Sequence, residues 1–292
     1  MWFNDDYTMS DPVKKPKMKL DFTGVQETLL ATLYSRWYDF QLPKLILGDK
    51  HAVEIVDQLD YDFTKLRMRP GTCASLCLRA RTFDRWTSEF LDAHGDQDVT
   101  VLHLAAGFDT RALRLQDNCG SNVHWIDLDV PDVVDMRRKL IPEPQLPGGY
   151  ELIAASVTDN DWLTSLPPHR PTVVVFEGLS CYLKPEEMRS MVERVTGHFK
   201  TGQLLFDAVA WIIISCQNLM SITRTTGAVL SWGTDDPHEL EAWHEGLKLK
   251  DIELMSDNKD NKDLSPKLQW ILWFVAHMPY FRYVGRHLRY EW

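Results

Sequence analysis

The chain has 292 residues and carries 32 Lys and Arg against 42 Asp and Glu, so its formal net charge at pH 7 is −10. This acidic balance argues against a general nucleic-acid-binding protein, which needs a cationic surface to neutralise phosphates. Hydrophobic residues make up 44% and charged residues 25% of the chain, a composition that argues against disorder and allows one large α/β domain or two smaller ones.

The first part of the chain, up to about residue 95, is predicted to be helical. Leu30, Leu33 and Trp37 recur at helical spacing after the polar Thr23, and a second helix is predicted over residues 74–91. Residues 1–22 contain no apolar segment of the kind found in a signal peptide, so no secretion signal is expected.

From residue 99 onwards, short apolar runs alternate with predicted helices. The helices are predicted over residues 131–140 and 184–199, the second with Pro185 early in its first turn. Such alternation predicts a parallel sheet covered on both faces, which binds ligands at the carboxyl ends of its strands. The predicted strands are residues 99–107, 123–129, 150–155, 172–176 and 203–207.

The cysteines and the longest apolar run narrow the class of protein further. The five cysteines are odd in number and scattered, which favours reduced thiols in a cytoplasmic enzyme over disulfides or a zinc site. No cluster of His, Cys and Asp has the spacing of metal ligands, so no metal is expected. The apolar run at residues 208–214 is too short to cross a bilayer, and no stable membrane insertion is expected.

Two of the predicted strand ends carry features of a nucleotide site. The first strand runs into LAAGFDTRALRL, where small residues at 105–107 let the backbone approach a ligand, although the loop is not GxGxxG. The second strand ends in IDLDVP, and an acid there can accept hydrogen bonds from both ribose hydroxyls. Asp127 and Asp129 are both candidates, and one of them could instead cap the helix that opens at Pro131.

Three segments resemble a known enzyme family. LHLAAGFDTRALRL, HWIDLDVPDVVDMRRKLI and VVVFEGLSCYLKPEEM are similar to signature segments of the leucine carboxyl methyltransferase and polyketide O-methyltransferase (tetracenomycin-type) family, a class I group that depends on S-adenosylmethionine (SAM). The similarity covers about residues 25–255. It implies an α/β fold, a Rossmann-like class I methyltransferase with a mostly parallel seven-stranded sheet, helices on both faces and a helical N-terminal lid.

The resemblance also implies a division of the chain and a set of cofactor contacts. A single methyltransferase domain, residues 1–292, would comprise a lid (1–95), a SAM-binding core (96–210) and a substrate-binding insertion with the last two strands (211–292). Arg81 would pair with the methionine carboxylate of SAM, and Arg79 is a neighbour with which it could be confused. The other implied contacts are Ala105 and Gly107 for the methionyl part, Asp129 for ribose, Ser156 and Val157 for adenine, and Glu177 for the amino group.

The sequence departs from the family pattern at two of these positions. Ala105 stands where the family usually has the first glycine of its loop, which is tolerable if the backbone angle there is ordinary. Ser156 stands where many relatives have an Asp for the adenine amino group, and its hydroxyl can still accept a hydrogen bond.

Methyl transfer from a sulfonium is an in-line displacement that requires alignment and exclusion of water. A carboxylate acceptor needs no general base, whereas a phenol, with a pKa of about 10, gains from one. No catalytic residue is assigned; Tyr182 and His277 are the candidates, and Tyr182 and Trp211 are candidates for substrate contact. His103, inside the first strand, is expected to be a core residue.

Tryptophan is concentrated towards the C-terminus, and we expect at least two aromatic residues of this region to line an acceptor pocket. The predicted function is a SAM-dependent O-methyltransferase that acts on a carboxylate or phenolic hydroxyl of a small polyketide-like or aromatic metabolite. Alternatives are a protein C-terminal carboxyl methyltransferase, a nucleotide-dependent oxidoreductase or a non-catalytic binding protein. The six tryptophans concerned are Trp211, Trp232, Trp243, Trp270, Trp273 and Trp292.

Overall fold

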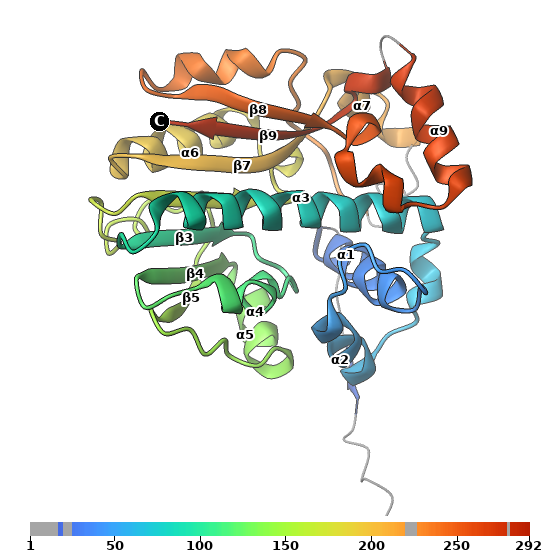
Figure 1. The fold of residues 1–292 in the computed structure, drawn as a ribbon, viewed down its shortest axis with the longest axis horizontal. Helices are drawn as coiled ribbons and strands as arrows, with labels where there is room; N and C mark the ends of the chain where they lie inside the picture. Colours follow the sequence, from blue (N-terminus) through green and yellow to red (C-terminus); the bar gives the residue numbers. More distant parts are fainter. Residues whose placement is uncertain (1–16, 20–24, 220–226, 279–280) are drawn as a thin grey trace, which may run out of the picture.

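A seven-stranded sheet forms the centre of the computed structural model, which describes residues 17–19, 25–219, 227–278 and 281–292. The strand order is β5-β4-β3-β6-β7-β9-β8 (Figure 1). Strands β3 to β7 are parallel, and β9 runs antiparallel between β7 and β8. The bounds are β3 Val99–Leu104, β4 Val123–Asp129, β5 Tyr150–Ala154, β6 Thr172–Phe176, β7 Gly202–Val209, β8 Lys248–Leu254 and β9 Gly285–Glu291. The five strands predicted from the sequence are confirmed as β3 to β7, and with them the predicted Rossmann-like fold class.

Helices cover both faces of the sheet, which explains why its central strands are apolar on both sides. In β6, Val173 and Val175 pack against α3 (Pro70–His94), whereas Val174 and Phe176 pack against α6 (Pro185–His198). Alternate side chains of one strand thus enter two separate cores. Helix α5 (Pro131–Leu140) packs against β4 and β5, and the short α4 (Arg111–Arg114) follows the loop after β3. These helices confirm the predicted ones to within a few residues.

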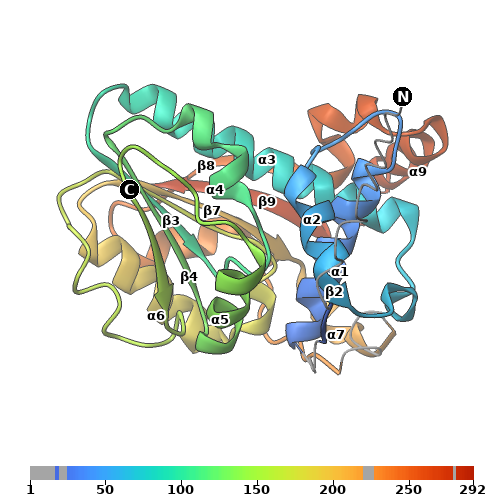
Figure 2. The ribbon, with the colours of Figure 1, turned by 90° about the horizontal axis from the view of Figure 1, so that it is seen from below.

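The N-terminal helices lie beyond the carboxyl ends of the strands, as the lid of the resemblance implies (Figure 2). They are α1 (Val25–Phe40) and α2 (Lys50–Gln58), with a two-stranded ribbon of β1 (Met18–Lys19) and β2 (Leu59–Asp60). Leu30 and Leu33 of α1 share a core with Phe108 of the loop after β3. The lid is therefore packed directly on the first predicted ligand loop. Thr23, the predicted start of the first helix, lies outside the described residues.

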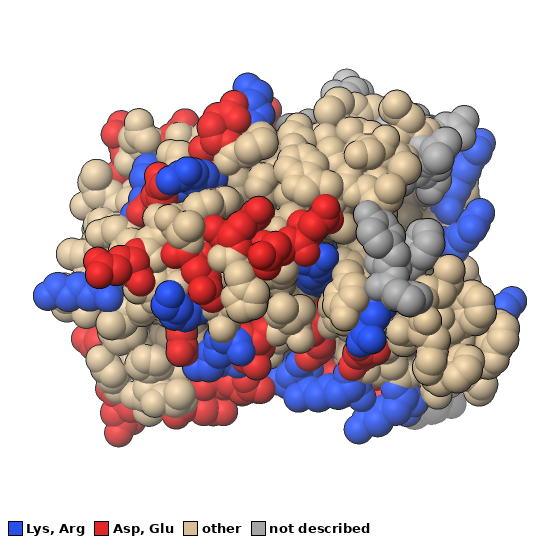
Figure 3. Space-filling model, turned by 90° about the horizontal axis from the view of Figure 1, so that it is seen from above, with Lys and Arg blue, Asp and Glu red and all other residues tan. Residues whose placement is uncertain are grey.

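The C-terminal part supplies α7 (Trp211–Ser215), α9 (Pro266–Ala276) and the strands β8 and β9. Its tryptophans have different surroundings: Trp232 is buried in the core on the α6 face, whereas Trp270 and Trp273 on α9 are 65% and 56% exposed. No helix among the described residues is long and apolar enough to cross a membrane. On the face seen in Figure 3, basic and acidic side chains are interspersed and form no continuous cationic surface.

His287 of β9 is a buried titratable group that the sheet holds in its neutral form. Its side chain lies on the α3 face, where its ring centre is 5.4 Å from that of Phe83, and the residue is 3% exposed. Its Nδ1 has no hydrogen-bond partner among the described residues. Burial lowers the pKa of His287 to about 4, from an ordinary 6.5.

Acidification should therefore destabilise the protein through His287. Between about pH 6.5 and pH 4 the unfolded chain binds a proton at this residue and the folded chain does not, so stability falls as the pH falls. We expect His287→Gln to remove roughly 3 kcal/mol of this loss, measured by urea unfolding at pH 7 and pH 4.

The matched control is His238→Gln, because the His238 side chain is 65% exposed. This variant should lose stability over the same pH range as steeply as the wild type. An equally steep loss in His287→Gln would contradict the assignment.

Candidate functional site

The loop between β3 and α4 forms the first wall of the site, and its backbone is constrained. Ala105 has a φ of +50° and Gly107 a φ of +52°. The condition placed on Ala105 from the sequence is therefore not met, because an alanine in the left-handed region is strained by its Cβ. At Gly107 a Cβ would lie 2.9 Å from Cδ2 of Leu29 in α1, so glycine allows the lid to approach.

Arg137 of α5 holds this loop through hydrogen bonds to its carbonyl oxygens. This residue was not identified from the sequence. Its Nη1 donates hydrogen bonds to the carbonyl oxygens of Gly107 at 2.6 Å and Asp109 at 2.8 Å. Its Nη2 pairs with the carboxylate of Asp127. One buried guanidinium thus fixes both the loop after β3 and the end of β4.

The two acids at the end of β4 have different roles in the structure. Asp127 is 1% exposed and accepts hydrogen bonds from Trp125 Nε1 at 2.9 Å and the Tyr150 hydroxyl at 2.8 Å, besides its pair with Arg137. Although burial acts in the opposite direction, Arg137 and a hydrogen bond with His103 lower the pKa of Asp127 to about 2. Asp127 is therefore a satisfied core carboxylate, and His103, 1% exposed, is the predicted core histidine.

Asp129, at the carboxyl end of β4, is the second of the two acids. Its Oδ2 accepts a hydrogen bond from the Gly107 N–H at 2.7 Å, and its Oδ1 accepts one from the Val130 N–H at 2.8 Å. Burial raises the pKa of Asp129 and outweighs these hydrogen bonds. Each oxygen keeps lone pairs for a further donor, so this carboxylate can bind a diol beside the loop.

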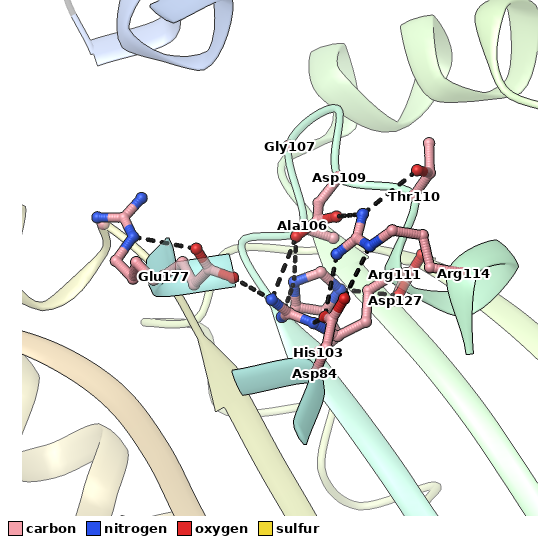
Figure 4. Close-up of polar contacts among 12 residues, drawn as sticks. Asp84, His103, Ala106, Gly107, Asp109, Thr110, Arg111, Arg114, Asp127 and Glu177 are labelled. Carbon is pink, nitrogen blue, oxygen red and sulfur yellow. Dashed lines mark hydrogen bonds and ion pairs between the residues drawn. The ribbon is translucent and has the colours of Figure 1, made fainter. Parts of the chain in front are cut away.

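A second charged group lies at the ends of β6 and β7 (Figure 4). Arg79 of α3 donates from Nε to Glu177 at 3.0 Å and from Nη1 to Asp207 at 2.8 Å, while its Nη2 has no hydrogen-bond partner among the described residues. Glu177 also binds Arg111 of α4. Although burial alone would lower it, Asp207 and Glu177 raise the pKa of Arg79. Arg79 is thus a fixed cation with one nitrogen left for an anion.

Further ion pairs connect α4 with α3, with the loop after β3 and with the lid. Arg114 of α4 pairs with Asp84 of α3 at 2.8 Å and with Asp109 at 2.7 Å. Arg36 of α1 also reaches Asp109, at 2.8 Å, and Asp49, which precedes α2, lies 3.2 Å from Arg114. Figure 4 shows that the side chains from α3, the loop and α4 converge on one another. We call the residues Arg36, Asp49, Arg79, Asp84, Asp109, Arg111, Arg114, Glu177 and Asp207 the edge network.

The structure places Arg81 elsewhere. Its guanidinium lies 2.9 Å from Asp263 and 3.5 Å from Asp260, in the segment that precedes α9. Because two residues of a helix are separated by about 200° around its axis, Arg79 and Arg81 point to different sides of α3. In this structure Arg81 thus binds carboxylates near α9, whereas its neighbour Arg79 lies beside Glu177.

Ser156 and Val157 follow β5 at the same edge of the sheet as Asp129. The Ala155 N–H donates to the Asp129 carbonyl oxygen at 2.9 Å, which sets where the chain leaves the sheet. The Ser156 hydroxyl lies 2.7 Å from that of Thr158, and the carbonyl oxygen of Val157 accepts a hydrogen bond from Arg194. The loop thus presents a half-buried hydroxyl and a buried valine side chain near Asp129.

The three candidates for catalysis or acceptor contact lie in three different segments of the chain. Tyr182 lies in the turn after Glu177, and burial raises its pKa to about 12, with a hydrogen bond to Thr28 of α1 acting the other way. Trp211, 39% exposed, begins α7 directly after β7. His277 is exposed and contacts the Trp273 carbonyl oxygen of its own helix, 2.7 Å from Nδ1, so the structure does not bring it to the edge network.

The arrangement can bind a particular kind of ligand. A carboxylate beside a tight loop suits a diol, and 3.0 Å separates the Arg79 and Glu177 side chains, which suit a carboxylate and an ammonium group. No group of three or more His, Cys, Asp and Glu side chains in the described ranges could hold a metal ion. The donor set therefore fits an adenosyl amino acid.

Comparison with known proteins identifies the relatives of this chain. Residues 37–196 match the family model for leucine carboxyl methyltransferase. The tetracenomycin polyketide synthesis O-methyltransferase TcmP of Streptomyces glaucescens is 40% identical over 268 residues, which cover 92% of this chain and 97% of that protein. The S-adenosyl-L-methionine-dependent methyltransferase dpfgK of Gibberella zeae is 34% identical over 80% of this chain and 84% of its own.

Solved structures agree on the fold. A methyltransferase-fold protein from Thermobifida fusca covers 92% of this chain and 96% of its own with a TM-score of 0.58 and 16% identity. A protein from Streptomyces avermitilis covers 88% of this chain and 96% of its own with a TM-score of 0.55 and 14% identity. At these identities the likeness concerns the fold alone.

The strain at Ala105 gives a testable expectation for stability. Ala105→Gly removes a Cβ from a left-handed backbone, so we expect the free energy of unfolding to rise by about 1 kcal/mol. Ala106→Gly is the control, because Ala106 is buried without a positive φ and should lose stability. Urea unfolding measures both, and a loss in Ala105→Gly equal to that in the control would show that Ala105 is unstrained.

Proposed function

This chain belongs to the leucine carboxyl methyltransferase family, and from that premise we propose that it transfers a methyl group from SAM to an oxygen atom of a small polyketide-like or aromatic metabolite. The observation that carries the proposal is that Asp129, after β4, binds the β3 loop, while Arg79 and Glu177 bind each other at the end of β6, on the other side of that loop. Family membership gives no support to the oxidoreductase alternative.

The proposed cofactor contacts differ at one position from those that the family resemblance implies. Arg79 replaces Arg81 as the partner of the methionine carboxylate, because its free Nη2 lies at the carboxyl edge of the sheet. Glu177 accepts the amino group. Asp129 binds the ribose hydroxyls and Asp127 stays in the core. The loop at Ala105 and Gly107 borders the methionyl part, and Ser156 and Val157 border adenine.

The chain's own residues then orient the cofactor and exclude water. SAM, when bound, supplies a methyl group activated as a sulfonium. Leu29 on the lid covers Gly107, which shields this part of the loop from solvent. Tyr182, whose pKa is raised to about 12, keeps its proton at neutral pH and acts as a hydrogen-bond donor rather than a base. Alignment therefore provides the catalysis, which suits an acceptor that is already ionised.

The proposal includes a small-molecule acceptor that Tyr182 and Trp211 contact, and a cytoplasmic location. The one relative named for polyketide synthesis, TcmP, supports a small-molecule acceptor. The five free cysteines support the second, since reduced thiols are typical of that compartment.

Isothermal titration and a transfer assay test the proposal together. The wild-type chain should bind S-adenosylhomocysteine and should transfer label from methyl-labelled SAM to at least one member of a panel of hydroxylated aromatic acids. Alkaline lability of the product then distinguishes an ester from an aryl ether. Arg79→Gln should weaken binding of S-adenosylhomocysteine about ten-fold or more, because a charge-assisted hydrogen bond is lost.

Arg81→Gln is the matched control, since it removes the same charge two residues away on the same helix. It should leave this affinity unchanged, with thermal unfolding used to verify that both variants fold. Absence of S-adenosylhomocysteine binding to the wild type would refute the function. A loss confined to Arg81→Gln would refute only the assignment of Arg79.

A further inference from the structure

A pocket lies at the β8 and β9 side of the sheet, and no residue of the edge network lines it. It has a volume of about 610 Å³. Apolar walls come from the residue after β7, from the start of the 3-10 helix η5 (Pro237–Trp243) and from β8, and the other side is formed by the turn before β9. The residues that carry the argument are Ala210, Pro237, Ile252, Leu254, Tyr283 and Arg286. The size suits a ligand of two or three fused rings.

The pocket is on the opposite face of the sheet from Arg79. In β9 the side chains alternate, so His287 lies against Phe83 of α3 whereas Leu288 joins the core on the α6 face. Arg286 is on the same face as Leu288. The pocket is therefore built from residues other than those proposed to bind the cofactor, and its ligand can be tested separately.

Arg286 is a buried cation without a paired carboxylate. It is 5% exposed, and its Nε and Nη1 donate to the backbone carbonyl oxygens of Tyr283 at 2.8 Å and Asp235 at 2.9 Å. No carboxylate oxygen of the described residues lies within 4.0 Å of it, unlike Arg79 or Arg111. Burial lowers the pKa of Arg286. A buried charge in this condition is costly, and an anion in the pocket would offset the cost.

Three acids line the pocket, of which Glu253 is paired with Arg85, and the other two are Asp257 and Asp235. Asp257 is paired with Arg282 at 2.8 Å. Asp235 is exposed to solvent, and its Oδ1 accepts the Trp211 N–H at 3.1 Å. None of the three forms an ion pair with Arg286 among the described residues, although the charge of Asp235 acts against burial on the pKa of Arg286, and Nη2 of Arg286 has no hydrogen-bond partner there. The positive group that faces the pocket is therefore available to a ligand.

An aromatic surface accompanies this cation. The Cζ atoms of Arg282 and Arg286 lie 5.1 Å and 5.8 Å from the centre of the Tyr283 ring, which holds both guanidinium groups near the mouth of the pocket. Tyr283 is 44% exposed, so one part of its ring remains open for stacking. Guanidinium geometry matches a carboxylate, with two N–H groups for two oxygens.

From this combination we infer that the pocket binds an aromatic carboxylic acid, with Arg286 as the group that recognises the carboxylate. The ring system lies against Ile252, Leu254 and Pro237, and the carboxylate meets the free nitrogen of Arg286. The inference stands independently of methyl transfer.

Isothermal titration of the full chain with 2-naphthoate, 2-naphthamide and 2-naphthylmethylammonium tests the inference. The wild type should bind 2-naphthoate about ten-fold more tightly than the neutral amide. Arg286→Gln should abolish this preference, and Lys250→Gln, which removes a cation from the exposed part of β8, should keep it. Equal affinity for acid and amide in the wild type, tighter binding of the ammonium compound, or an unchanged preference in Arg286→Gln would overturn the inference.

A second variant serves if Arg286→Gln does not fold. Ile252 lines the pocket and is 45% exposed, so Ile252→Glu adds a carboxylate without burying it. It should weaken binding of 2-naphthoate several-fold more than binding of 2-naphthamide, and an equal effect on both would contradict the inference. S-adenosylhomocysteine binding, measured in parallel, should not change. Its absence in the wild type would refute the proposed function and leave this inference standing.

Discussion

The positions of Arg79, Glu177 and the loop after β3 depend on the buried edge network. Each of its four arginines, Arg36, Arg79, Arg111 and Arg114, contacts at least two carboxylates. Desolvation of such charges is expensive, and only good geometry with several partners offsets it. Removal of one partner from a buried pair costs about 3–5 kcal/mol, so the network tolerates few alternative arrangements. The lid, α3, the β3 loop and the ends of β6 and β7 are thereby fixed relative to one another.

This constraint explains how an enzyme without an assigned general base can act. If catalysis consists of alignment and exclusion of water, the groups that hold the cofactor must not move when it binds. Arg79 is held at two nitrogens by Glu177 and Asp207, and the third is the nitrogen proposed to bind the cofactor. Asp129 is held by two backbone N–H groups in the same way. The site is preorganised by hydrogen bonds that already exist in the free chain.

The sequence predicts the sheet because its strands are buried on both faces and read as continuous apolar runs, as in Thr172–Phe176. The pattern of an acid at the end of the second strand leaves Asp127 and Asp129 as candidates for ribose, and the family resemblance points to Asp129. The resemblance pointed to Arg81 rather than its neighbour Arg79. The sequence could not check that choice, because it depends on the rotation of α3 against the sheet, which packing at Phe83 and Phe90 sets.

Contacts between distant segments account for the remaining differences. Arg137 and Asp84 bind groups from other elements, and no local motif marks them. The left-handed φ of Ala105 is likewise not visible, because alanine gives no signal for it. The tryptophan concentration predicted a pocket, yet Trp232 packs in the core and Trp270 lies on an exposed helix face. Composition alone does not separate these environments.

The most direct test of the account is a crystal structure of the full chain with S-adenosylhomocysteine. The account predicts the ribose hydroxyls on Asp129 and the amino acid carboxylate on Arg79, with the edge network in the arrangement described above. A carboxylate bound to Arg81, or a ribose away from Asp129, would contradict it.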